Sequence, residues 1–170
     1  RPRAPRRRTE VPVSRTPLLE REAELAAMHA VIDAAHGGVG RVIAIEGRAG
    51  MGKTRLVGEA RALAAEVGFE VLVARSADLE QEFAYGVVRQ LFEPFLAALA
   101  PEERDEVMAG TAGLADRLFG DEELTGAASG DVSFAVLHGL YWLAANLASQ
   151  RPTAIVIDDE EPEPQLVELL

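Results

Sequence analysis

The sequence predicts an α/β fold in which helices cover both faces of a parallel sheet, a three-layer α/β/α arrangement. Two short apolar, β-branched runs, residues 41–46 and 70–75, are separated by a glycine-rich stretch and a segment rich in helix formers. A strand, a helix and a strand at this spacing form a βαβ unit, which implies parallel strands. A third apolar run, residues 153–159, follows a largely helical middle. The 170 residues suffice for one domain with a buried core.

The glycine-rich stretch carries the strongest chemical signal. Residues 47–54 read Gly-Arg-Ala-Gly-Met-Gly-Lys-Thr and fit the phosphate-binding pattern G-x-x-x-x-G-K-[ST], the P-loop. Glycines allow sharp turns, so successive N–H groups can face an anion at the positive end of the following helix. Lys53 is the only lysine in the chain. Its ammonium would contact the β- and γ-phosphates, and the Thr54 hydroxyl would bind Mg²⁺.

Two carboxylates, Asp158 and Asp159, close the third apolar run. Parallel sheets bind ligands outside the carboxyl ends of their strands, which is also where the P-loop opens. Asp158 would then lie near Mg²⁺, and Asp159 would orient or deprotonate a water molecule. The alternative is that both acids are turn or cap residues, which often follow strands.

Composition narrows the function. The net charge is −11, yet the first fifteen residues hold six arginines and one acid, Glu10. Residues 1–17, with four prolines, are expected to form a flexible leader or, alternatively, a contact for phosphate or acidic surfaces. The acidic remainder is a poor nucleic-acid surface. There is no cysteine, no visible signal peptide and no apolar stretch long enough to span a bilayer, so we expect a cytoplasmic protein.

Helical periodicity predicts the buried faces of three helices. The first begins at Leu18, buries Leu25, Met28, Ile32 and Ala35, and stops at Gly37-Gly38. Residues 84–100 carry a second stripe, Val87, Leu91, Phe95 and Leu99, with Pro94 expected to kink or divide the helix. Residues 134–148 carry a third, Phe134, Leu137, Tyr141, Ala144 and Ala148, which we expect in the core rather than on a base-stacking surface.

Shorter elements lie between these helices. A helix is expected to begin at Pro101, whose acidic neighbours favour the positive end of a helix. Residues 114–119 read as another short helix, and residues 120–131 as a loop. The three histidines show no metal-ligand spacing and receive no catalytic role.

Five blocks together resemble one family: residues 18–25, 47–54, 83–94, 137–143 and 155–159. From about Leu18 to Asp159 the chain is similar to the nucleotide-binding domain of large ATP-binding LuxR-type transcriptional regulators, in the STAND branch of AAA-like P-loop ATPases. The P-loop and the acidic strand end, called Walker A and Walker B, are shared across a vast superfamily. The two middle blocks are the more specific pointers.

The resemblance implies an ATP-controlled switch, with ATP or ADP and Mg²⁺ as ligands, an unknown sensed ligand, and nucleotide-dependent self-association. Lys53 and Asp159 would be catalytic, Thr54 and Asp158 would bind the metal, and Arg21 would lie near the adenine. The residues implied in nucleotide binding are Arg21, Gly47, Arg48, Ala49, Gly50, Met51, Gly52, Lys53, Thr54 and Arg55.

The chain departs from the family pattern after Asp159. The family continues with an apolar residue and His-Trp-Ala-Asp, whereas residues 160–164 here read Glu-Glu-Pro-Glu-Pro. We therefore expect slow or no hydrolysis. In the family, a later strand lies between the P-loop strand and the Walker B strand. We therefore expect residues 18–170 to be an ATPase domain only through Walker B, without the family's DNA-binding domain. The sheet should then have a gap or a different strand order, and the isolated chain should be marginally stable or need a partner or the missing remainder.

Three other functions are compatible with a P-loop but fit the rest of this sequence less well. A small-molecule kinase, or another metabolic P-loop enzyme, is the main alternative, but such a kinase needs a mobile basic lid and no arginine-rich segment follows the loop. A GTPase would need an Asn-Lys-x-Asp segment, which a chain with one lysine cannot supply. A remnant that binds no nucleotide is the remaining alternative.

Overall fold

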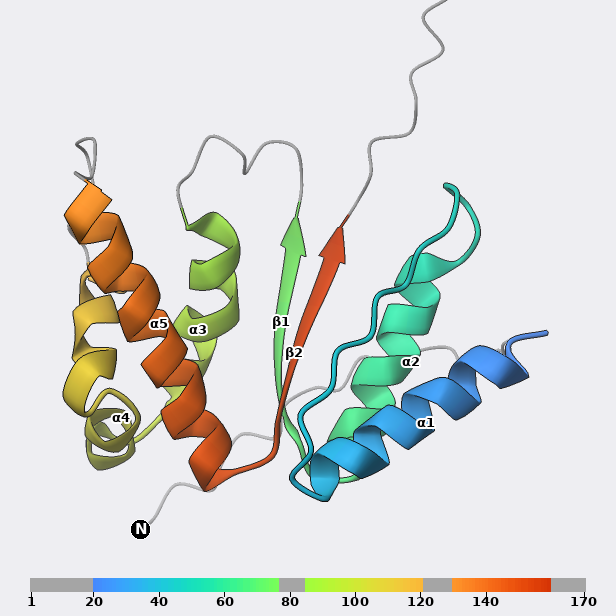
Figure 1. Ribbon diagram of the computed structural model, residues 1–170, viewed down its shortest axis with the longest axis horizontal. Coiled ribbons are helices and arrows are strands. Elements are labelled where there is room, and N and C mark those ends of the chain that lie inside the picture. Colours follow the sequence, from blue (N-terminus) through green and yellow to red (C-terminus); the bar gives the residue numbers. More distant parts are fainter. Residues whose placement is uncertain (1–19, 77–84, 121–129, 160–170) are drawn as a thin grey trace, which may run out of the picture.

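The computed structural model of the chain describes residues 20–76, 85–120 and 130–159. Its sheet consists of two strands, β1 (Glu70–Ser76) and β2 (Thr153–Asp159). Helices α1 (Glu22–His36) and α2 (Lys53–Glu66) lie on one face of this sheet. Helices α3 (Gly86–Ala98), α4 (Pro101–Val107) and α5 (Gly130–Gln150) and the 3₁₀ helix η2 (Gly110–Leu118) lie on the other face (Figure 1). Helices on two faces of a parallel sheet agree with the predicted layers.

The two strands pair in parallel and in register, from Glu70 opposite Thr153 to Ser76 opposite Asp159. Two of the three predicted apolar runs are therefore strands. The outer edge of β1 is closed by a side chain of α3. The Arg75 N–H donates to Gln90 Oε1 at 2.9 Å, and Gln90 Nε2 donates to the Arg75 carbonyl at 3.1 Å. The Gln90 amide thus satisfies backbone groups that an edge strand otherwise leaves open.

The strand predicted at residues 41–46 is not formed, so the first half of the predicted βαβ unit is wrong. Within the part of the chain that the structure describes, the sheet contains only β1 and β2. Residues 41–46 run alongside β2 without a ladder, and Val42 is 95% exposed (Figure 1). An apolar, β-branched run becomes a strand only when a neighbour completes its backbone hydrogen bonds, and β2 is not close enough to do so.

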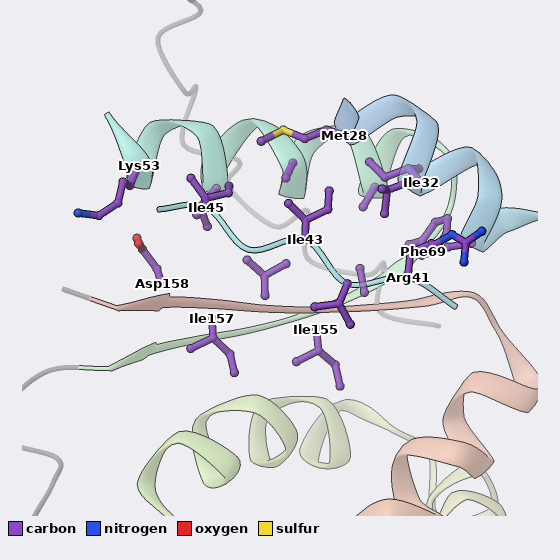
Figure 2. Close-up of a pocket in the computed structure, with 18 of the residues that line it drawn as sticks. Met28, Ile32, Arg41, Ile43, Ile45, Lys53, Phe69, Ile155, Ile157 and Asp158 are labelled. Atoms are coloured by element: carbon purple, nitrogen blue, oxygen red, sulfur yellow. The ribbon is translucent and has the colours of Figure 1, made fainter. Parts of the chain in front are cut away.

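A groove of about 870 Å³ separates residues 41–46 from β2. Apolar side chains line most of its length, among them Met28, Ile32, Ile43, Ile45 and Phe69, and Lys53 and Asp158 lie at one end (Figure 2). This groove is consistent with the incomplete sheet expected from the sequence. The second expectation, a closed sheet with a different strand order, is not observed among the described residues.

The core lies between β1 and the helices α3, α4, α5 and η2. It contains Leu72 and Ala74 of β1, Leu91 and Phe95 of α3, and Leu143 of α5, all buried. The stripe predicted for α3 is confirmed, and Pro94 lies inside the helix without dividing it. The face predicted for α1 is confirmed by Met28, which is buried, although its neighbours on that face are only half-buried.

The shorter elements follow the predictions closely. Helix α4 begins at Pro101, and the Glu103 carboxylate accepts a hydrogen bond from the Ala100 N–H at 3.1 Å, which caps that end. The helix expected at residues 114–119 is part of η2. The expectations for residues 1–17, for most of the loop at 120–131 and for residues 160–170 lie outside the described residues. Among the described helices, none combines the length and hydrophobicity needed to cross a membrane.

The buried face predicted for α5 is wrong except at Ala144, which is half-buried against the core. Phe134 is 71% and Tyr141 66% exposed, and Leu137 is exposed as well. The buried side chains are instead Val136, Leu143 and Leu147. The exposed rings contact one another along the helix: Phe134 stacks on His138, and Tyr141 meets Trp142 edge to face.

Gly139 explains which face of α5 is buried. A Cβ at this position would lie 2.6 Å from the Ala115 backbone nitrogen, so α5 approaches η2 more closely here than any side chain allows. Asn146 lies on the same side of α5 and donates to the carbonyls of Val107 and Ala109, at 3.0 and 3.2 Å. Close backbone contact and these two hydrogen bonds outweigh the burial of the aromatic stripe.

Replacing Gly139 by alanine should therefore destabilise the chain by about 1–3 kcal/mol, as expected for overpacking in a tight contact. Gly58→Ala is the matched control, because Gly58 lies in α2 and a Cβ there meets no atom within 4 Å. That change should stabilise by about 0.5–1 kcal/mol through helix propensity. Urea denaturation followed by circular dichroism measures both. Equal stabilisation by the two substitutions would show that α5 does not depend on this contact.

Candidate nucleotide site

The glycine-rich loop leads from residues 41–46 into α2. Gly52 precedes α2 in the left-handed conformation, with φ of 82°, and Gly50 has φ of 77°. Side chains at these two positions would be strained, since L-residues rarely adopt such angles. Inside the loop, the Met51 N–H donates to the Arg48 carbonyl at 3.2 Å. The loop therefore turns tightly onto the positive end of a helix, the geometry that binds phosphate groups through backbone N–H donors.

Lys53, the first residue of α2, folds back onto the loop. Its ammonium donates to the Gly47 carbonyl, with 2.7 Å between Nζ and O. This contact holds a positive charge at the loop. A hydrogen bond between two charged groups is stronger than one to a neutral carbonyl, so a phosphate oxygen would compete well for the same ammonium.

Thr54 and Asp158 bring together two parts of the chain that are 104 residues apart. The Thr54 hydroxyl donates to Asp158 Oδ1 at 3.3 Å. Thr54 lies in the first turn of α2, and Asp158 lies at the carboxyl end of β2. Asp158 is only 7% exposed, and a buried carboxylate is costly unless strong donors or a cation compensate it. A hydroxyl at this distance is a weak donor, so the carboxylate has capacity for a cation.

The Thr54 and Asp158 oxygens fit Mg²⁺, which takes one or two protein oxygens together with phosphate oxygens and water. Among the described residues no three acidic or histidine side chains gather into a larger metal site. The Asp159 backbone pairs with Ser76, but its side chain lies outside what the structure describes, so its catalytic role stays a prediction.

Arg21 contacts the loop from outside. It precedes α1, donates from Nη1 to Glu24 Oε1 at 2.6 Å, and donates from Nη2 to the Met51 carbonyl at 3.0 Å. Donation from Arg21 holds the pKa of the Glu24 carboxyl below its usual range. Glu24 was not among the predicted site residues, although its spacing of three from Arg21 on a helix is a usable signal.

The structure connects four of the predicted site residues through their side chains. Arg21, Lys53, Thr54 and Asp158 are joined to the loop or to one another by hydrogen bonds. The remaining members of the set are exposed on the loop or the first turn of α2: Gly47, Arg48, Ala49, Gly50, Met51, Gly52 and Arg55. Whether each of them contacts a nucleotide stays a prediction.

In a comparison with protein families, residues 17–164 match a family described as AAA ATPase domain. No curated protein and no solved structure matches the chain. The match includes the loop, α2, both strands and Asp158, so the geometry above and the family agree on a nucleotide-binding domain of the P-loop α/β class. Because the match covers most of its length, the chain belongs to the AAA ATPase domain family.

Proposed function

We propose that the chain is a Mg-ATP-binding switch module that hydrolyses ATP slowly or not at all. The observation that carries this proposal is the contact of Thr54 with the buried Asp158, at 3.3 Å, beside the lysine of the glycine-rich loop. Phosphate-binding donors and a cation-ready carboxylate meet there at the carboxyl end of β2. The loop N–H groups and Lys53 would bind the phosphates, while Thr54 and Asp158 would hold Mg²⁺, which neutralises phosphate charge when bound.

A switch requires two arrangements that nucleotide distinguishes. In one arrangement, which the structure contains, Lys53 bonds to Gly47 and Thr54 bonds to Asp158. A bound phosphate would draw the Lys53 ammonium away from the Gly47 carbonyl, because the charged acceptor is stronger. Mg²⁺ would likewise take the Thr54 and Asp158 oxygens. Both changes lie where the loop, α2 and β2 meet, so ligand binding would alter how these segments hold one another.

We further assign the module to a LuxR-type transcriptional regulator of the STAND class. Two sequence blocks support this assignment, residues 83–94 and 137–143. Block 83–94 supplies Gln90, which closes the edge of β1. Block 137–143 supplies Gly139, at the close contact with η2. The proposal includes a cytoplasmic location, where ATP is available, and a sensed ligand or protein as the second input.

Lys53→Ala should weaken Mg-ATP binding at least tenfold, about 1.4 kcal/mol or more, because it removes the charge-assisted contact to the phosphates. Arg61→Ala removes one positive charge from the same helix beyond the loop and serves as the control. Isothermal titration calorimetry measures the dissociation constants. Equal affinity of Lys53→Ala and the unchanged protein would overturn the assignment of the site.

Asp158→Asn should abolish the benefit that Mg²⁺ gives to ATP binding, because the amide keeps the shape of the carboxylate and loses its charge. The affinity of the variant for ATP should be the same with Mg²⁺ as with a chelator, whereas the unchanged protein should bind ATP more tightly with Mg²⁺. Calorimetric titrations with and without EDTA compare the two conditions. Full Mg²⁺ dependence in the variant would place the metal elsewhere.

Hydrolysis should be slower than about 1 per second, below the range of ordinary enzymes. A switch needs a long-lived bound state, and the acidic residues that follow Asp159 in the sequence should disturb the attacking water. Single-turnover assays with excess protein over labelled ATP measure the rate of the chemical step. Faster turnover would count against a switch and in favour of the alternative, a metabolic P-loop enzyme.

A further inference from the structure

Arg21 lies outside the loop, and its side chain bonds to the loop backbone. Its own position is fixed at the start of α1, since its carbonyl accepts the Leu25 N–H at 3.0 Å. Its guanidinium is held between two acceptors, the Glu24 carboxylate at 2.6 Å and the Met51 carbonyl at 3.0 Å. Two contacts at fixed angles leave the planar guanidinium little freedom to rotate.

The peptide bond that Arg21 contacts is the one that leads into α2. In a planar trans peptide, the carbonyl of one residue and the N–H of the next point in opposite directions. Because the Met51 carbonyl is drawn outward to Arg21, the Gly52 N–H points away from α1. Gly52 immediately precedes Lys53, and its left-handed conformation turns the chain into the helix. Its N–H is therefore among the donors available to an anion at the start of α2.

We propose that Arg21 is a positioning residue for the phosphates: by holding the Met51 carbonyl it aims the Gly52 N–H at the bound anion. This rests on the proposed function, because it assumes that phosphate binds to the loop. Donation by a cation to the carbonyl also polarises the peptide group and makes its N–H a stronger donor. Glu24 holds the guanidinium, and the hydrogen bond from Arg21 in turn lowers the pKa of the Glu24 carboxyl.

The inference differs from an adenine contact, which is the role that the family resemblance implies for this segment. An adenine contact affects ATP and leaves a ligand without a base unchanged. A residue that positions the Gly52 N–H affects every ligand with a phosphate chain by the same factor. It also couples α1 to the loop, so phosphate binding and the placement of α1 depend on each other.

The first test compares Mg-ATP with Mg-tripolyphosphate by calorimetry, in the unchanged chain and in Arg21→Ala, Arg21→Lys and Glu24→Gln. Arg21→Ala should weaken both ligands by the same factor, about tenfold, the value of one charge-assisted hydrogen bond. Arg21→Lys keeps a donor and should recover part of the loss, and Glu24→Gln should cause a smaller loss. Arg61→Ala should change neither affinity. Weakening of ATP alone would overturn the inference, and so would no change for either ligand.

The second test needs no ligand, so it separates failure of this inference from failure of the proposed function. Loss of the hydrogen bond in Arg21→Ala should move the carbonyl ¹³C resonance of Met51 upfield and shift the amide ¹⁵N resonance of Gly52. Amides in the second half of α2 should stay unchanged, which shows that the variant is folded. Unchanged Met51 and Gly52 resonances would overturn the inference. If the unchanged chain binds neither ligand, the proposed function fails, and the resonances still decide whether Arg21 positions the loop.

Discussion

The parallel ladder between β1 and β2 is the interaction on which the rest of the structure depends. Its register, from Glu70 opposite Thr153 to Ser76 opposite Asp159, brings Asp158 to the carboxyl end of the sheet. Helices α3, α4, α5 and η2 form the core with β1 on one face of the sheet. Helix α2 packs on the other face, near β2. Only because β2 is fixed in this position does Asp158 meet Thr54 at the start of α2. The candidate site is therefore a product of strand pairing between segments far apart in the sequence.

The two edges of this sheet are treated differently. Gln90 closes the outer edge of β1 with a pair of hydrogen bonds that imitates a neighbouring strand. The edge of β2 that does not pair with β1 borders the apolar groove, and residues 41–46 lie on the opposite side of this groove. The loop is consequently attached to the fold by side-chain contacts of Arg21, Lys53 and Thr54 rather than by a ladder. A loop held in this way can respond to a ligand that competes for those contacts.

Much of the site was predictable because its chemistry is local. The spacing of Gly47, Gly52 and Lys53 is a pattern of eight consecutive residues, and a tight turn into a helix needs no distant partner. The contact of Arg21 with the loop was not predictable in the same way. The acceptor for Arg21 is a backbone carbonyl thirty positions along the chain, and every residue type offers that group, so no side-chain pattern marks it.

The sequence by itself determined the glycine-rich loop, the helix that follows it, the apolar strands β1 and β2, and the acid that ends β2. Each of these depends on propensity or periodicity within a short window. Only the tertiary structure decided whether residues 41–46 form a strand and which face of α5 is buried. A strand exists through its neighbour, and residues 41–46 pair with none among the described residues. Helix α5 has apolar side chains on more than one face, and the close approach at Gly139 selects among them, because a side chain at this position would clash with the backbone of η2.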